Sequence, residues 1–204
     1  MKILATLALF LGGGTANGVL VITDIPDDSL FGIVSDAELD IDIDGDGISD
    51  VRLEADNRAM NISSLRENVS LATFVTGGLD RGGNNAPFAR GEEIGGILPD
   101  GATWFQASLE EGSSTLLSCV SIGCIGLWGG GVNYTGIQIT DDEGNNRYGW
   151  IEIDAPFDTI PGGIIQKHAF ETEANRSIFA VPELSSTMLL LLGTGSAFFR
   201  RKRI

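Results

Sequence analysis

Two segments in the last third of the chain form the pattern of a β-hairpin. Residues 134–140 read Tyr-Thr-Gly-Ile-Gln-Ile-Thr, and residues 147–153 read Arg-Tyr-Gly-Trp-Ile-Glu-Ile. β-Branched and aromatic residues recur at every second position in both, which is the period of a strand. The segment between them, residues 141–146, is rich in Asp, Asn and Gly and is typical of a turn. The pattern therefore predicts a pair of antiparallel strands, and the rest of the chain must fold against that sheet.

The remainder of the chain also favours strands. Among 204 residues there are 28 glycines, and Val, Ile, Thr and Asn are abundant. Helical periodicity is visible only at the two ends, and sheets without helices must pack on one another. We therefore expect an all-β fold, a β-sandwich or jelly-roll-like domain. The predicted strands are Val19 to Thr23, Leu39 to Ile43, Asp50 to Ala55, Val69 to Val75, Thr103 to Leu109, Gly136 to Thr140, Arg147 to Ile153 and Gln166 to Glu171.

The charge of the chain limits its partners. The formal net charge is −15, and all 28 acidic residues lie between Asn17 and Glu183, where only eight basic residues offset them to give −20. Such a surface repels the phosphates of nucleic acid and of anionic lipid, and it attracts cations. We expect no nucleic-acid partner.

The amino terminus is typical of a secretory signal peptide. Lys2 is followed by an apolar run from Ile3 to Leu11 and then by small residues up to Ala16. The apolar run is too short to span about 30 Å of hydrocarbon, and small residues suit cleavage after Ala16. We predict a signal peptide over residues 1–16 and a single acidic β-rich extracellular domain over residues 17–180, a usual size for one domain.

The two cysteines of the chain lie five positions apart. Cys119 and Cys124 enclose a four-residue segment, and the chain has no other thiol. In an oxidising compartment the expected product is a local disulfide, and the alternative is two free, buried thiols. One distant histidine, His168, does not complete a zinc set with them.

An aspartate-rich segment has the spacing of a calcium-binding loop. With Asp42 as position 1, Asp44, Asp46 and Asp50 fall at positions 3, 5 and 9, and the carbonyl of Ile48 is available at position 7. Gly47 at position 6 permits the sharp bend that such a loop needs. The segment resembles the Asp-x-Asp-Gly-Asp-Gly-x-x-Asp loops of thrombospondin type 3 and related extracellular repeats.

Position 12 of this loop holds Leu53 where an EF-hand has a bidentate Glu. We therefore expect a structural calcium ion that binds with a dissociation constant of about 10⁻⁴ to 10⁻³ M. The alternative is a solvated acidic turn between two strands, although four carboxylates within nine residues repel one another without a cation.

The sequence offers no catalytic set. A triad would have to use His168, the only histidine, and the chain has no Gly-x-Ser-x-Gly motif. Pairs of acidic residues that could serve glycoside hydrolysis are expected by chance among 28 acids, namely Glu92 with Glu93, Glu110 with Glu111 and Glu152 with Asp154. We expect no enzymatic activity.

The three tryptophans, Trp104, Trp128 and Trp150, allow two interpretations. Exposed on one face, they could stack on sugar rings. Buried, they would belong to the core, which is the more common place for tryptophan in a small β domain.

The carboxyl terminus has three consecutive parts. Val181, Pro182 and Glu183 come first, an apolar segment from Ser185 to Phe199 follows, and the chain then turns basic. As a helix the 15-residue apolar segment would be about 22 Å long, short for a permanent span. The basic residues favour a cytoplasmic carboxyl end, with the body outside. They are Arg200, Arg201, Lys202 and Arg203.

This tail resembles that of the PEP-CTERM family, in which Val-Pro-Glu-Pro precedes a short transmembrane helix and an arginine cluster. The resemblance covers residues 181–204, with Leu184 where the family usually has its second proline. It implies recognition by an exosortase-like membrane protease and a membrane contact through the tail. The Tyr148-Gly149-Trp150-Ile151 strand resembles one that recurs in proteins with such tails.

These features predict an exported cell-surface or extracellular-matrix protein that is structural or exopolysaccharide-associated, and that is held at the envelope or released after its tail is processed. The alternative from another class is a calcium-assisted carbohydrate-binding protein or carbohydrate-active enzyme.

Overall fold

The structure is a computed structural model that describes residues 6–9, 19–25, 30–31, 37–55, 59–74, 83–106, 114–120, 123–125, 127–128, 130–155 and 163–180. Within these ranges the regular elements are all strands, so the expected all-β class is confirmed. The strands are β1 (Thr6–Leu9), β2 (Leu20–Asp24), β3 (Leu30–Phe31), β4 (Ala37–Ile41), β5 (Val51–Ala55), β6 (Ala59–Ser64), β7 (Val69–Phe74), β8 (Asn84–Asn85), β9 (Pro87–Phe88), β10 (Glu93–Ile94), β11 (Ala102–Phe105), β12 (Ser114–Val120), β13 (Gly123–Ile125), β14 (Gly131–Thr140), β15 (Asn146–Ala155), β16 (Gly163–Glu171) and β17 (Ile178–Phe179).

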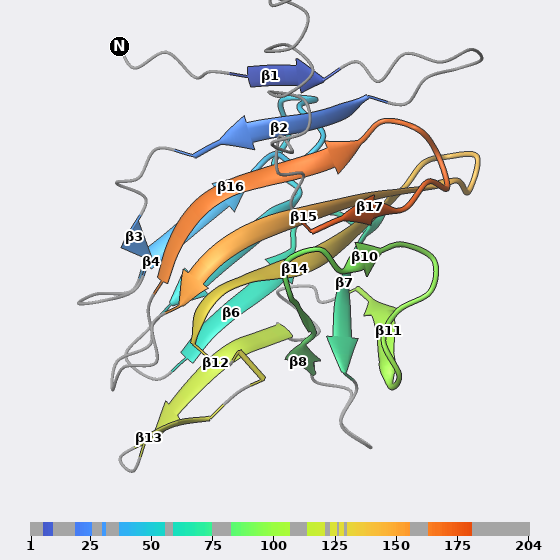
Figure 1. Cartoon of the computed structure of the whole chain (residues 1–204). Coiled ribbons are helices and arrows are strands. Elements are labelled where there is room, and N and C mark those ends of the chain that lie inside the picture. Colours follow the sequence, from blue (N-terminus) through green and yellow to red (C-terminus); the bar gives the residue numbers. More distant parts are fainter. Residues whose placement is uncertain are drawn as a thin grey trace, which may run out of the picture.

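Fifteen strands belong to one hydrogen-bonded sheet, and β10 pairs with β17 separately. The main order is β1-β2-β16-β15-β14-β7-β8-β12-β6-β5-β4. The sheet curls, so that β4 and β6 lie behind β14, β15 and β16 in Figure 1. Chain segments that are distant in sequence thus come to face each other across a shared core.

The predicted hairpin is confirmed as the centre of the sheet. β14 and β15 pair antiparallel over ten positions, from Gly131 opposite Ala155 to Thr140 opposite Asn146. The turn is closed by Asp141, whose Oδ1 accepts hydrogen bonds from the backbone N–H groups of Glu143 (3.1 Å) and Asn145 (2.8 Å). Short Asp side chains form such turns readily, which explains why this element is visible in the sequence.

The central strands are covered on both faces. On β15, Ile151 and Ile153 pack into one cluster of buried residues, and Tyr148 and Trp150 pack into a second cluster on the opposite face. This alternation follows from the two-residue period of a strand. The first cluster also contains side chains of β4, β5 and β6, among them Ile41, Leu53 and Ile62, so it fills the space inside the curl.

A β-bulge in β16 decides which face His168 occupies. Lys167 lies opposite Glu152 and Ile165 lies opposite Ile153, so Gln166 is an extra residue on β16. One extra residue reverses the in-and-out alternation beyond it. Ile165 and Phe170, at odd and even positions, therefore both reach the first cluster, and His168 lies on the same face as Phe170.

Each predicted strand overlaps a strand of the structure, but some ends differ. The strand expected from Leu39 to Ile43 ends at Ile41, where the aspartate loop begins. β6 and β12, which pair with each other in the sheet, were not predicted. Their sequences, Ala-Met-Asn-Ile-Ser-Ser and Ser-Thr-Leu-Leu-Ser-Cys-Val, lack a clean alternation of polar and apolar residues.

The cysteines lie on adjacent strands. The backbone register of β12 and β13 places Cys119 directly opposite Cys124. Opposed residues on antiparallel strands have Cα atoms about 4.5 to 5.5 Å apart, within the range that a disulfide bridges. The register is compatible with the predicted disulfide, which stays a prediction.

The two ends are described only in small part. Residues 6–9 form β1, which pairs with β2, and removal of residues 1–16 would leave β2 paired with β16 alone. The tail over residues 181–204 lies outside the described residues. No helix with the length and apolar character needed to cross a membrane occurs in the described part of the chain.

Candidate metal centre

The aspartate-rich segment connects two paired strands. Ile41 at the end of β4 lies opposite Val51 at the start of β5, and the backbone N–H of Asp50 donates to the carbonyl of Ile41 at 2.9 Å. Within the loop Gly45 and Gly47 have φ angles of 79° and 89°, in the left-handed region that glycine adopts without strain. The two glycines let the chain fold back so that aspartates from both ends of the loop meet.

Asp50 is the buried residue at the end of this loop, next to β5. Its side chain has no solvent exposure (0%). One carboxylate oxygen, Oδ2, accepts hydrogen bonds from the backbone N–H groups of Ile43 at 2.8 Å and Asp44 at 3.4 Å. The other oxygen, Oδ1, accepts from the Arg66 guanidinium at 3.0 Å. A buried carboxylate needs such partners, and here they fix the start of the loop against its end.

Three of the predicted ligands come together. Carboxylate oxygens of Asp42, Asp44 and Asp50 all lie within 4.8 Å of one another. Hard oxygen donors at this spacing suit calcium, which takes six to eight oxygen ligands and would draw the others from carbonyls and water. The residues therefore fit a calcium ion. Hydrogen bonds within the loop fix Asp42 in place: its Oδ1 accepts from the N–H of Gly45 (2.7 Å) and its Oδ2 from the N–H of Gly47 (2.8 Å).

The other two predicted ligands are placed differently. Asp46 points one oxygen at the Ile48 N–H (2.8 Å) and the other at Arg66 (2.9 Å), and it is not part of the three-carboxylate group. The side chain of Ile48 is 59% exposed, at the tip of the loop. Asp46 and the Ile48 carbonyl remain predicted ligands, and Asp46 would have to leave Arg66 to bind.

Arg66 belongs to the candidate site, and the sequence did not indicate it. It lies in the turn between β6 and β7, and its Nη1 bridges Asp46 and Asp50. Arg66 is one of eight basic residues in an acidic domain, and its distance of 16 residues from Asp50 gives no local pairing signal. Four aspartates and one guanidinium leave the site with a charge of −3 when all are ionised.

Burial and the neighbouring negative charges both affect the pKa values of these aspartates. Burial raises the pKa of Asp50, and burial together with the neighbouring Asp46 and Asp42 charges raises the pKa of Asp44. The Ile48 N–H, by contrast, lowers the pKa of the exposed Asp46. The ionised forms of Asp44 and Asp50 are thus less favourable in the fold than in water, and a bound cation would stabilise them.

The residue at the missing twelfth position has a structural role. Leu53 is fully buried in the first cluster on β5, and Glu54 faces the other way because the strand alternates. A glutamate at position 53 would place a carboxylate in the hydrophobic core, which is costly. The loop therefore lacks the twelfth ligand of an EF-hand because its second flank is a strand of the sheet.

Two of the acidic residues named as candidates for glycoside hydrolysis make contacts within the fold. Glu152 is buried, accepts a hydrogen bond from the Tyr134 hydroxyl at 2.7 Å and lies 3.3 Å from Lys167 Nζ. Glu92 caps the Ala89 N–H. Glu110 and Glu111 lie outside the described residues.

Two of the three tryptophans belong to the core. Trp128 is 1% exposed and Trp150 is fully buried, so the packing interpretation is right for both. Trp104 is partly buried, stacks on Tyr148 with ring centroids 5.7 Å apart and donates its Nε1–H to the Gly95 carbonyl.

Comparison of the chain with protein-family models, with curated proteins and with solved structures gives no match.

We predict that Asp50→Ala lowers the free energy of unfolding by about 2–3 kcal/mol in the presence of a chelator, because the buried Ile43 N–H loses its acceptor and the Arg66 guanidinium loses one of its two carboxylate partners. Asp50→Asn should cost much less, since an amide oxygen can still accept from Ile43. Urea unfolding followed by tryptophan fluorescence measures both changes. Equal losses in the two variants would contradict the acceptor role of Asp50.

Proposed function

We propose that this chain is an exported cell-surface or extracellular-matrix protein, non-enzymatic, whose acidic β domain is stabilised by a calcium ion at the Asp42–Asp50 loop. The observation that carries the calcium part is the convergence of three carboxylates, one of them fully buried, at the junction of β4 and β5. Outside the cell calcium is present at the concentrations that a weak site needs. The domain would therefore be most stable after export, where calcium is available to bind.

The position of the loop supports a stabilising role for the ion. Asp50 connects β4 and β5 to the β6–β7 turn, because its carbonyl accepts the Leu65 N–H (2.8 Å) and its side chain binds Arg66. A cation at Asp50 would hold together three parts of one side of the curled sheet. We propose further that the curled sheet forms a sandwich-like fold. The core enclosed between β4–β6 and β14–β16 supports this proposal.

The proposed route to the surface rests on the sequence of the two ends. A signal peptide over residues 1–16 would start export, and an exosortase-like protease would process the tail after Val181-Pro182-Glu183 is recognised. The mature protein would then be the acidic domain, with exopolysaccharide or other envelope components as its partner.

A carbohydrate-binding protein is the second candidate, and Trp104 is the observation that favours it. It is the one tryptophan that is not fully enclosed, and its ring is oriented by Tyr148 and by the Gly95 carbonyl. An indole held in this way is suited to stack on a sugar ring.

We expect calcium to stabilise the protein by mass action. With a dissociation constant of 10⁻⁴ to 10⁻³ M, 10 mM calcium should raise the free energy of unfolding by about 1.4–2.7 kcal/mol. Asp50→Asn should abolish this increase, because it removes a charged ligand. The measurement is chemical unfolding of the full chain in detergent, with calcium or with chelator.

The matched control for this titration is Asp142→Asn, which removes the same charge from the exposed β14–β15 turn. It should keep the full calcium effect. A similar calcium effect in Asp50→Asn would show that calcium acts on the general surface charge, and no effect in the wild type would refute the calcium site.

We expect the tail to be removed in a host that has an exosortase-type protease and retained in a matched host without it. Pro182→Ala should block this processing, and Leu184→Pro should increase it by restoring the second proline of the family motif. Intact-mass analysis of the exported protein measures the loss of the tail.

Thr187→Ala, which lies just after the Pro-Glu step, should leave tail processing unchanged. Retention of the complete tail in both hosts, or equal processing of Pro182→Ala and wild type, would contradict the proposed sorting route.

A further inference from the structure

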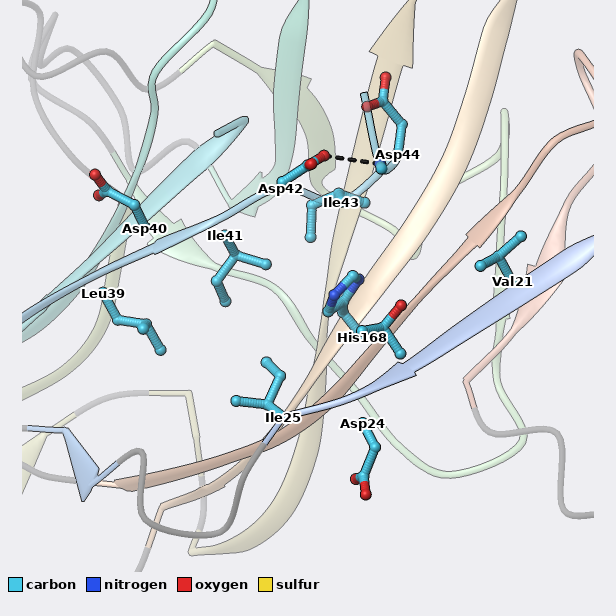
Figure 2. A pocket seen from close by; sticks show the side chains of 12 residues that line it. Val21, Asp24, Ile25, Leu39, Asp40, Ile41, Asp42, Ile43, Asp44 and His168 are labelled. Carbon is cyan, nitrogen blue, oxygen red and sulfur yellow. Dashed lines mark hydrogen bonds between the residues drawn. The ribbon is translucent and has the colours of Figure 1, made fainter. Parts of the chain in front are cut away.

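A pocket of about 590 Å³ lies beside the aspartate loop, between β2, β4 and β16. It adjoins the three-carboxylate group and shares Asp42 and Asp44 with it, but not Asp50. Pockets of this size accommodate small organic molecules. In Figure 2, His168 lies between Ile25 and Ile41 on one side and Val21 on the other, whereas Asp24 and Asp40 point away from it. The lining residues used below are Val21, Ile25, Leu39, Ile41, Asp42 and His168.

His168 is buried, and its Nδ1 has no hydrogen-bond partner among the residues that the structure describes. Its side chain is 6% exposed. The imidazole extends from β16 toward the side of the pocket formed by Ile43 and Asp42 (Figure 2). An unpaired buried nitrogen is unfavourable, and such groups in native proteins call for an explanation such as a ligand.

Burial disfavours the charged form of the His168 ring. Burial lowers the pKa of His168 to about 4, and the attraction of the Asp42 carboxylate only partly opposes this. A neutral imidazole has one nitrogen that accepts a hydrogen bond. The imidazole can therefore accept from a ligand without repelling a positive charge.

The charge and polarity of the walls define the ligand further. Four aspartates and no basic residue line the pocket, and one of them, Asp40, is already paired with Arg52 at 2.7 Å. Aliphatic side chains line much of the rest, with Val21 and Ile25 on the β2 side and Leu39 and Ile41 on β4. Anions would be repelled, and an inorganic cation would make no use of the aliphatic walls.

We propose that this pocket binds a small organic cation, an ammonium group attached to an apolar alkyl or aryl body. The ammonium would lie between the Asp42 carboxylate and the His168 imidazole, and the apolar body would pack on the β2 and β4 side chains. The ligand would satisfy the buried Nδ1 of His168, which has no hydrogen-bond partner among the described residues, and would neutralise part of the charge of the pocket. This assignment does not require calcium at the adjacent loop.

The test uses the full chain with a chelator present, so that calcium does not compete for Asp42. His168 is the only histidine, so its Cε1–H gives a single identifiable NMR signal. Titration with 2-phenylethylammonium should shift this signal saturably, with a dissociation constant of about 1 mM or lower. The isosteric alcohol 2-phenylethanol and the anion 3-phenylpropanoate should both bind at least about tenfold more weakly, because they lack the cationic head.

A variant separates the pocket from general attraction to an acidic surface. By calorimetry, His168→Phe should weaken 2-phenylethylammonium binding at least about tenfold. Glu143→Gln, which removes an exposed charge in the β14–β15 turn, should leave binding unchanged. The proposal is overturned if the His168 signal does not move up to 10 mM ligand, if the alcohol or the carboxylate binds equally well, or if a folded His168→Phe protein binds like the wild type. The ligand comparison on the wild type decides the matter even if His168→Phe does not fold.

Discussion

The burial of one carboxylate organises the side of the molecule on which both candidate sites lie. Asp50 is fully enclosed, and it can be so only because backbone N–H groups at the start of the loop and Arg66 from the β6–β7 turn surround its two oxygens. These contacts bring Asp42 and Asp44 back toward Asp50 and set the position where β4 ends. The charge that remains unbalanced after Arg66 has been counted is what makes a cation favourable there.

The pocket beside the loop depends on a second constraint, the packing of the central strands on both faces. Because β15 and β16 each supply side chains to two clusters, a single extra residue changes which cluster a position reaches. The bulge at Gln166 places His168 on the face that meets β4. A histidine one position away would face the opposite cluster, and no imidazole would reach the aspartates.

The elements that could be predicted from the sequence are those whose signals are local. The β14–β15 hairpin follows from the alternation of its residues and from a turn rich in Asp, Asn and Gly. The aspartate loop follows from the spacing of its aspartates and from its glycines. The predictions did not include β6 and β12, whose strand character comes from neighbours in the sheet, nor the ion pair of Arg66 with Asp50, which joins residues 16 positions apart. Trp128 joins a cluster whose other members, such as Ile41 and Ile151, are distant from it in sequence.

The central claim is that the loop between β4 and β5 holds a calcium ion through Asp42, Asp44 and Asp50. The most direct measurement is a crystal structure of the protein grown with calcium, with anomalous data collected to identify the ion. The account predicts one anomalous peak about 2.3–2.6 Å from oxygens of all three aspartates. A well-ordered loop in which Arg66 alone neutralises the carboxylates, with no peak among them at 10 mM calcium, would contradict it.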